Sequence, residues 1–365
     1  MQGHHERLPG LMMVRIDRWG GRGLIATATL ALVLAGCSTE PPTGPSRLMK
    51  PICADSSGTI VTDPNTDTVR AFARDGRGLW SHDQEDGRFV ATAGECAAQV
   101  FSALISDWAD PSVRDPDPLA YLPDGRTVPW PGRAAHSKFR VLAATQVGTG
   151  VVATADGQHT TLRTQVDGRM TASEEMKSAA LDWGIAPDGK TAAAFDYGTA
   201  GGRLIILERG ADRWAITSRT EVAEPVHAVF LRDKDTYVLA HQDRYDLHTG
   251  ATTRRIGGPR DTSDVFMAGD NIALLSRMTN AEQDLTEVRI LGKDLRPRFS
   301  TSAAQVAVVS AFHNAVVLSF PGRTVVVDGD QHRELDVPAS RYTFAGQDNT
   351  VVQVGKDDIR TQEGL

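Results

Sequence analysis

Short runs of alternating hydrophobic and polar residues dominate the chain from Phe139 to its end, and Gly, Asp, Asn and Pro separate them. Alternation with a period of two is typical of β-strands, whose successive side chains point to opposite faces, and the separating residues are those that form turns. The longer period of an amphipathic helix is missing from these runs. The pattern therefore predicts a fold that is mostly β.

One hairpin recurs in this pattern: a strand, a polar turn containing Gly, and a second strand with a large residue four positions after the Gly. From Gly168 onward the glycines lie 42, 40, 42 and 37 residues apart. Gly adopts the positive φ of a tight hairpin without steric cost, and we expect the Trp or Arg that follows to pack between neighbouring sheets. The copies are Gly76 with Trp80, Gly168 with Ala172, Gly210 with Trp214, Gly250 with Arg254, Gly292 with Arg296, and Gly329 with Arg333.

Two further strands precede the later hairpins, which makes four strands per repeat. Four-stranded units spaced by about 42 residues are typical of β-propeller blades. We expect an all-β propeller over residues 48–365, with seven blades, or eight if residues 91–138 contain a blade around Gly125. The predicted strand pairs are 180–185 with 191–196, 226–231 with 236–240, 265–268 with 271–276, and 305–311 with 315–320.

The last repeat has three candidate strands, at 341–345, 350–354 and 358–361. Because a closed ring has no exposed sheet edge, we expect a strand from the beginning of the domain to supply the fourth.

Residues 91–138 interrupt the repeats and are rich in proline toward their end. We interpret them as an insertion, with a short helix over residues 95–107. Trp108 and Trp130 flank the proline-rich part. They either form an exposed recognition surface or pack the insertion onto the ring.

The repeat resembles the blade motif of the quinoprotein-like propellers, a group with PQQ-type, YVTN-type and WD40-like repeats. Asp246, Thr249 and Gly250 match the motif, but Arg254 replaces its Trp. The resemblance implies a propeller over most of residues 48–365 and indicates little about a ligand.

The first 36 residues have the character of a signal peptide: Arg15, Arg18 and Arg22 precede the apolar run 24–34. This run is shorter than the roughly 20 residues of a transmembrane helix. The sequence Leu34-Ala-Gly-Cys37 resembles the bacterial lipobox. The resemblance implies cleavage before Cys37, a lipid on that cysteine, and attachment to the outer face of a membrane. Residues 37–47 are then a flexible tether rich in Pro, Ser, Thr and Gly.

Two cysteines remain in an exported domain, Cys53 and Cys96, and we predict a disulfide between them. The alternative is two free buried thiols. The formal net charge of −7 becomes −9 when the signal peptide, with four Arg, one Asp and one Glu, is removed. This charge argues against nucleic-acid binding.

The search for catalytic motifs is negative, and the sequence predicts no cofactor and no metal site. Asp63, Asn65 and Asp67 begin like a calcium loop, but the later positions of that motif fail. A channel site would have to combine four residues from separate blades, namely His227, His313, Asp182 and Asp264.

Two functions remain open. One is an accessory or scaffold protein that binds a partner in the cell envelope. The other is a propeller enzyme, or a protein that binds a small ligand such as a quinone or sugar in its central channel.

Overall fold

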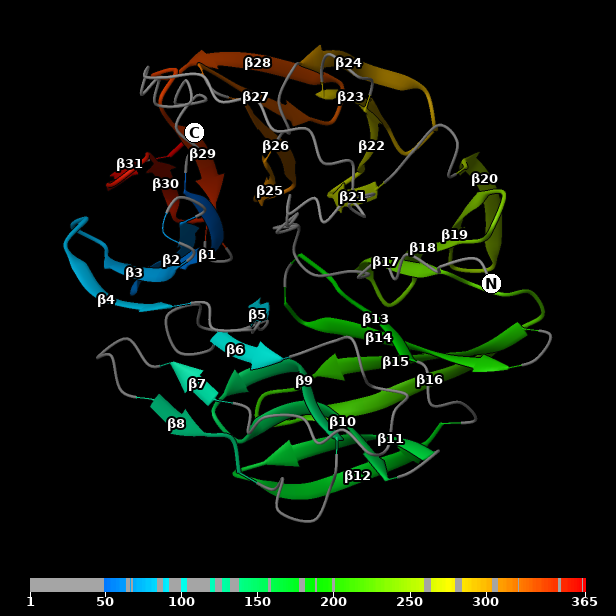
Figure 1. Ribbon diagram of the computed structural model, residues 1–365. Coiled ribbons are helices and arrows are strands. Elements are labelled where there is room, and N and C mark those ends of the chain that lie inside the picture. Colours follow the sequence, from blue (N-terminus) through cyan, green and yellow to red (C-terminus); the bar gives the residue numbers. More distant parts are fainter. Residues whose placement is uncertain are drawn as a thin grey trace, which may run out of the picture.

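In the residues that it describes, the computed structural model has eight antiparallel β-sheets arranged side by side in a ring (Figure 1). In each sheet the first strand along the chain lies nearest the middle of the ring and the last lies at the rim. This arrangement is a β-propeller, and it confirms the predicted fold class. The structure describes residues 49–365 except 64–65, 67, 84–87, 92–99, 104–118, 122–126, 132–137, 157–158, 177–180, 188, 199–200, 259–263, 280–283, 304–307, 321, 347–348 and 363.

Strands pair in chain order within every sheet, and we number the sheets 1 to 8 along the chain. Sheet 1 contains β1 (Lys50–Asp55), β2 (Gly58–Asp63), β3 (Thr68–Ala73) and β4 (Gly78–Asp83). Sheet 2 contains β5 (Arg88–Ala91), β6 (Val100–Ala103), β7 (Leu119–Tyr121) and β8 (Thr127–Pro129). Sheet 3 contains β9 (Lys138–Gln146), β10 (Thr149–Asp156), β11 (His159–Val166) and β12 (Arg169–Glu175). Sheet 4 contains β13 (Leu181–Ile185), β14 (Thr191–Gly198), β15 (Gly201–Arg209) and β16 (Trp214–Val222).

The second half of the ring repeats the same meander. Sheet 5 contains β17 (Ala228–Asp233), β18 (Thr236–Ala240), β19 (Tyr245–Thr249) and β20 (Thr252–Gly257). Sheet 6 contains β21 (Asp264–Ala268), β22 (Asn271–Thr279), β23 (Asp284–Leu291) and β24 (Pro297–Ala303). Sheet 7 contains β25 (Val308–Phe312), β26 (Ala315–Phe320), β27 (Arg323–Asp328) and β28 (Gln331–Asp336). Sheet 8 contains β29 (Tyr342–Ala345), β30 (Val351–Val354) and β31 (Ile359–Gln362).

Eight sheets are one more than the seven blades expected, because strands run through the segment interpreted as an insertion. β6, β7 and β8 lie within residues 91–138 and pair with β5 to form sheet 2. The alternative of eight units therefore matches the number of sheets. The short helix expected over residues 95–107 is also wrong in its described part, where Val100–Ala103 forms β6.

The hydrophobic core consists of separate apolar layers between neighbouring sheets. Trp214 is buried between sheets 3 and 4, in contact with a cluster that includes Leu162 and Ile205. Similar layers join sheets 4 and 5, 5 and 6, 6 and 7, and 8 and 1. The alternation of the strands explains this arrangement, since each inner strand presents apolar side chains to both neighbours.

Of the large residues that follow the hairpin glycines, Trp214 packs between two sheets as predicted, whereas the arginines do not. Arg254, Arg296 and Arg333 are exposed on the rim strand or just before it, so their side chains do not fill the space between sheets. The rim strands β20 and β28 are mostly exposed, and a guanidinium there stays in water at no cost.

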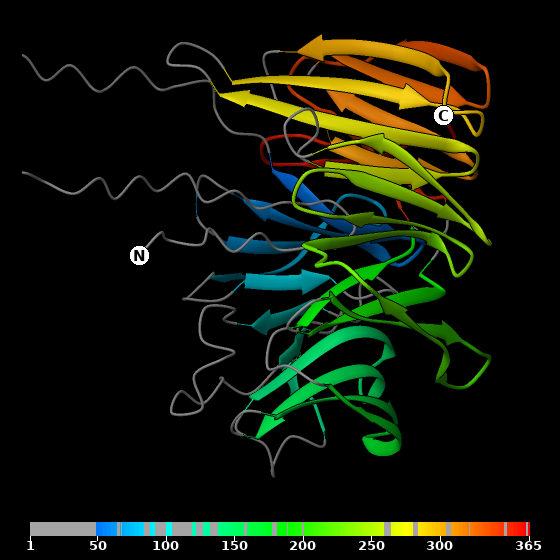
Figure 2. The ribbon, with the colours of Figure 1, turned by 90° about the vertical axis from the view of Figure 1, so that its right-hand side faces the viewer.

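The ring has two faces, because the strands run from one side of it to the other (Figure 2). Strands within a sheet alternate in direction, so the turns after the second strand and the links to the next sheet share one face. We call this the entry face; it carries the turns at 241–244 and 355–358. The turns after the first and third strands share the opposite face, which we call the far face. It carries the turns at 210–213 and 250–251.

Candidate functional site

The described chain enters the ring at Met49, on the entry face. Met49 is fully buried, and its N–H donates a hydrogen bond of 3.2 Å to the carbonyl of Gly355. Gly355 lies in the turn between β30 and β31, while the next residue, Lys50, begins β1. The first described residue therefore touches the last sheet immediately before it starts the first one.

The ring closes between sheets 8 and 1 through this contact and a second one near the rim. The hydroxyl of Thr361, on β31, donates a hydrogen bond to the carbonyl of Arg74, in the turn between β3 and β4. In the same turn Gly76 has a φ of +82°, and a Cβ there would lie 2.4 Å from the carbonyl oxygen of Ile359. That carbonyl points to the outer edge of β31. In the register of β30 with β31, it is the carbonyl of the preceding residue, Asp358, that points toward β30 and accepts a hydrogen bond from Gly355 N–H.

This closure corrects the expectation that a strand from the start of the domain completes the last sheet. In the part of the chain that the structure describes, sheet 8 has three strands and β1 pairs with β2 in sheet 1. The β3–β4 turn lies against the outer edge of β31 where a fourth strand would begin. A turn from the neighbouring sheet thus covers part of the edge.

Carboxylate–arginine pairs occur repeatedly on the entry face, within the hairpins formed by the second and third strands. Asp63 pairs with Arg70 across β2 and β3 at 3.3 Å. Asp196 pairs with Arg203 across β14 and β15 at 3.0 Å. Both partners are seven residues apart, and both carboxylates are almost completely buried. Asp63 therefore belongs to an ion pair within a hairpin, and its place in the failed calcium motif has this structural explanation.

Arg203 also links sheet 4 to sheet 3. Its guanidinium donates to Glu174 on β12 at 2.7 Å, and Arg219 on β16 donates to the other oxygen of the same carboxylate. The hydrogen bond from Arg219, followed by the charges of the two arginines, lowers the pKa of Glu174 below its usual value. The carboxylate thus stays ionised and holds two sheets together.

A third group lies at the turn between β18 and β19. Arg244 donates to Asp246 at 2.8 Å and to Glu224 at 2.6 Å. His241 is buried; its Nδ1 donates to the carbonyl of Pro225 at 2.9 Å, and its Nε2 lies 3.5 Å from Asp246 Oδ2. The hydrogen bonds to the two carboxylates raise the pKa of Arg244. The arrangement fastens the link from sheet 4 onto this turn.

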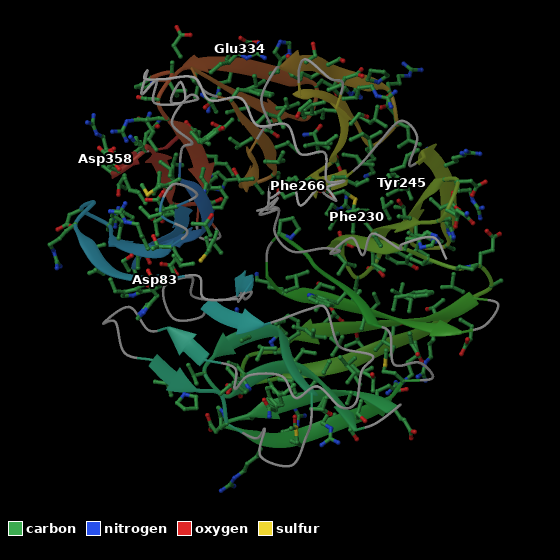
Figure 3. All side chains as sticks on the ribbon, in the orientation of Figure 1. Asp83, Phe230, Tyr245, Phe266, Glu334 and Asp358 are labelled. Atoms are coloured by element: carbon green, nitrogen blue, oxygen red, sulfur yellow. The ribbon has the colours of Figure 1, made fainter. Side chains whose placement is uncertain are left out.

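A fourth pair lies beside the chain entry. Arg341, which precedes β29, donates to both oxygens of Asp358 at 2.7 and 2.5 Å. Figure 3 shows Asp358 at the outer side of sheet 8, near β31. The hydrogen bond from Arg341 lowers the pKa of Asp358. The carboxylates in these four groups are all neutralised by guanidinium groups, which is an arrangement suited to structure.

Trp130, for which the sequence left open an exposed recognition surface or packing onto the ring, is buried with 2% of its surface exposed. Its indole N–H donates a hydrogen bond of 2.7 Å to Gln165 Oε1, and its ring packs against Phe139 and Val141 of sheet 3. Of the two interpretations, packing onto the ring is therefore correct for this residue. Trp108 lies outside the described residues.

The predicted lipid and disulfide positions are only partly within the structure. Cys37 and Cys96 lie outside the described residues. Cys53 lies on β1 and is buried in a cluster with Ile60, Val69 and Trp80. The strands on either side of Cys96 in the sequence, β5 and β6, belong to sheet 2, which is the next sheet around the ring (Figure 1).

The residues predicted to meet in the channel do not all converge. His227 precedes the innermost strand β17 and is exposed on the entry face. His313 follows the innermost strand β25 and is exposed in a turn on the far face. Asp264 is buried at the entry-face end of β21, where it accepts a hydrogen bond from the N–H of Val265, and Asp182 lies on β13. The two histidines are thus at opposite ends of the inner strands.

Large apolar residues also occupy the inner strands. Phe230 on β17 and Phe266 on β21 lie toward the middle of the ring, whereas Glu334 on β28 lies at the rim (Figure 3). Within the described ranges, no group of three His, Cys, Asp or Glu side chains is placed to hold a metal ion. Within the same ranges there is also no helix with the length and apolar character needed to cross a membrane.

No protein-family model and no curated protein sequence matches this chain. Among solved structures, the uncharacterized protein lmo1340 of Listeria monocytogenes EGD-e is 12% identical, with a TM-score of 0.43, over 76% of this chain and 95% of that one. The Dos1 propeller is 9% identical, with a TM-score of 0.43, over 85% of each chain. TolB from Acinetobacter baumannii is 11% identical, with a TM-score of 0.36, over 69% of this chain and 66% of that one. These similarities concern the fold alone.

Proposed function

We propose that this protein is a lipid-anchored β-propeller of the bacterial cell envelope that binds another envelope protein. The observation that carries the proposal is the sequence Leu34-Ala-Gly-Cys37, which follows an apolar run of signal-peptide length. The proline-rich residues after Cys37 then connect a lipid to a rigid ring. Membrane lipid at Cys37 and one protein partner are the expected interactions.

The arrangement of charged groups supports a scaffold over an enzyme. Asp63, Asp196 and Asp246, the buried carboxylates of the entry-face hairpins, each pair with arginine. Each of these carboxylates is occupied by a guanidinium group, whereas a general acid must be within reach of its substrate.

The lipid anchor is tested by Cys37→Ala in the full-length protein, expressed in a bacterium that processes lipoproteins. Wild-type protein should incorporate labelled fatty acid and sediment with membranes, whereas the variant should carry no label and stay in the soluble fraction. Ser46→Ala is the matched control, because it changes the same segment without removing a thiol. A Cys37→Ala variant that remained membrane-bound would contradict the proposal.

The scaffold role is tested by cross-linking in intact cells and purification of the wild-type protein. One stoichiometric envelope protein in the cross-linked product supports the proposal. If no partner is found, and a quinone or sugar raises the melting temperature of the purified ring by mass action, the ligand-binding alternative is favoured instead.

The disulfide between Cys53 and Cys96 remains a prediction of the same proposal, since exported domains retain such bonds. It would join sheet 1 to the segment between β5 and β6 of sheet 2. Denatured mature protein should show no free thiol before reduction and two after it. Two free thiols without reductant would exclude the bond.

A further inference from the structure

We infer that the ring opens and recloses at the junction between sheets 8 and 1 while its sheets stay folded. We call this the closure junction. Opening there is a conformational device of the ring itself, and it depends neither on a lipid at Cys37 nor on a protein partner.

The path of the chain sets the closure junction apart. The sheets follow one another along the sequence, so a covalent link joins each sheet to the next from sheet 1 to sheet 8. Sheets 8 and 1 contain the last and the first described strands, β31 and β1. Among the described residues, noncovalent contacts alone hold these two sheets together. At every other junction the chain limits how far two sheets can separate.

A strand shared by the two end sheets would close the ring with backbone hydrogen bonds, but the position beside β31 is already taken. The carbonyl of Arg74 accepts a hydrogen bond from the hydroxyl of Thr361, and Gly76 lies against the carbonyl of Ile359. The β3–β4 turn therefore runs antiparallel along β31 (Figure 1). Among the described strands, β31 pairs with β30 alone. A side-chain hydrogen bond and a close contact thus stand where a ladder of backbone bonds would be.

An apolar layer and one backbone hydrogen bond complete the closure junction. Phe72 on sheet 1 belongs to the same buried cluster as Val352 and Val354 on sheet 8. The N–H of Met49 donates to the carbonyl of Gly355 at 3.2 Å. Attraction between apolar surfaces is not directional, so the two sides of this layer can part without distortion of either sheet.

The junction between sheets 6 and 7 is held in more ways. It also has an apolar layer, but the chain passes directly from β24 to β25 across it. Arg298 on sheet 6 pairs with Asp330 on sheet 7 at 2.9 Å. The buried amide of Asn271 donates to the carbonyl of Val327 at 3.1 Å. Separation here would break a buried polar contact and would still be limited by the covalent link.

Proteins open locally at a lower free energy than that of global unfolding wherever few contacts have to break. At the closure junction no strand has to unfold, since sheets 8 and 1 each keep their own hydrogen bonds. The open ring exposes the apolar layer between these sheets and gives access to the inner strands from the rim.

The experiment measures how fast a buried cysteine reacts with a thiol reagent in full-length protein under native conditions. Val352→Cys places the thiol in the closure junction, and Val316→Cys is the matched control in the layer between sheets 6 and 7. Both valines are buried on the second strand of their sheet. The unsubstituted protein gives the background reaction, and urea titration gives the global stability of each variant.

We expect the thiol at position 352 to react at least tenfold faster than the thiol at position 316 in variants of similar global stability. Its rate should also rise less steeply with urea, because local opening exposes less surface than global unfolding does. Equal rates, or rates that both follow global unfolding, would overturn the inference.

A second substitution tests the contact across β31. Thr361→Val removes the hydroxyl that binds the Arg74 carbonyl, and it should speed the reaction at position 352 about two- to tenfold, as the loss of one hydrogen bond implies. The reaction at position 316 should not change. Thr252→Val, at an exposed position on β20, should alter neither rate. If Thr361→Val accelerated both thiols equally, the bond would stabilise the ring as a whole and the inference would be wrong.

Discussion

The backbone N–H of Thr343 donates a hydrogen bond of 2.6 Å to the hydroxyl oxygen of Ser319, across the junction between sheets 7 and 8. Ala345 N–H donates in the same way to Ser310, at 3.1 Å. Both N–H groups lie on the side of β29 that faces away from β30, where the described part of the chain offers no strand as a partner. Serine hydroxyls from sheet 7 thus satisfy the unpaired edge of the last sheet.

Replacing Ser319 with Ala should therefore destabilise the ring. The buried Thr343 N–H would lose its acceptor, and an unsatisfied buried donor costs about 1 to 3 kcal/mol. The free energy of unfolding from urea titration measures this loss. Ser300→Ala, at an exposed position on β24, is the control and should change stability by less than about 0.5 kcal/mol. Equal effects of the two substitutions would show that the hydrogen bond contributes nothing specific.

Arg203 and Arg219 both bind Glu174, yet their removal should differ strongly in effect. Arg203→Ala also removes the guanidinium from the fully buried Asp196, and breaking such a buried pair costs about 3 kcal/mol. Arg219 is about half exposed, so Arg219→Ala should cost at most about 1 kcal/mol. The free energies of unfolding of the two variants, measured by chemical denaturation, test this difference. A smaller loss of stability for Arg203→Ala than for Arg219→Ala would contradict the role given to the Arg203–Asp196 pair.

The pH dependence of stability should depend on Glu174. Its pKa in the folded protein lies below the ordinary value of 4.5, mainly because Arg219 donates to it. Folding therefore favours the ionised form; the stabilisation is present above about pH 4.5 and is lost as the pH falls through the lower, folded-state pKa. The Glu174→Gln variant lacks this stabilisation at every pH. The difference in the free energy of unfolding between wild type and variant should therefore narrow as the pH falls from 5 to 3. A constant gap over this range would refute the ion-pair role.

Gly76 should be the least replaceable of the hairpin glycines. Gly76→Ala forces alanine into a positive φ and brings its Cβ toward the Ile359 carbonyl. Gly250→Ala introduces a similar φ but meets no atom within 4 Å. Both should lose about 1 kcal/mol from backbone strain, and the Gly76 variant should lose a further 1 to 3 kcal/mol or so from overpacking. Thermal unfolding compares the stability of the two variants. Equal melting temperatures would mean that the β3–β4 turn shifts to accommodate the added Cβ at little cost in stability.

Much of the fold follows from the sequence because its determinants are local. The strands predicted at 191–196, 236–240 and 315–320 coincide with β14, β18 and β26 within a few residues, since alternation and turn residues mark them. Residues 91–138 were misassigned because they lack that alternation: the strand β6 lies where a helix was expected, and its pairing with β7 is a tertiary effect.

The backbone conformation of the hairpin glycines was predicted only in part. Gly76, Gly168, Gly250 and Gly329 have positive φ, as predicted. In the Gly292 turn it is Leu295 that takes this conformation, at +64°, because the turn is longer and closes with hydrogen bonds between Gly292 and both Leu295 and Arg296.

Side-chain contacts could not be predicted where the two partners lie far apart in the sequence. Trp130 is buried because Gln165 accepts its indole proton and sheet 3 provides an apolar surface, neither of which its proline-rich neighbourhood reveals. The entry-face ion pairs had a signal that was missed, namely Asp63 with Arg70 and Asp196 with Arg203 at the same spacing of seven across a hairpin. Ser319 carried no such signal, since its partner lies in another sheet.

Met49 bonds to the last sheet and opens the first. A pulling force applied through the chain before Met49 would act at the junction between the first and last sheets. In an anchored molecule this junction would therefore bear the force before any other part of the ring. Resistance of the protein to pulling would then depend on the contacts of Met49, Gly76 and Thr361 rather than on the stability of the remaining sheets.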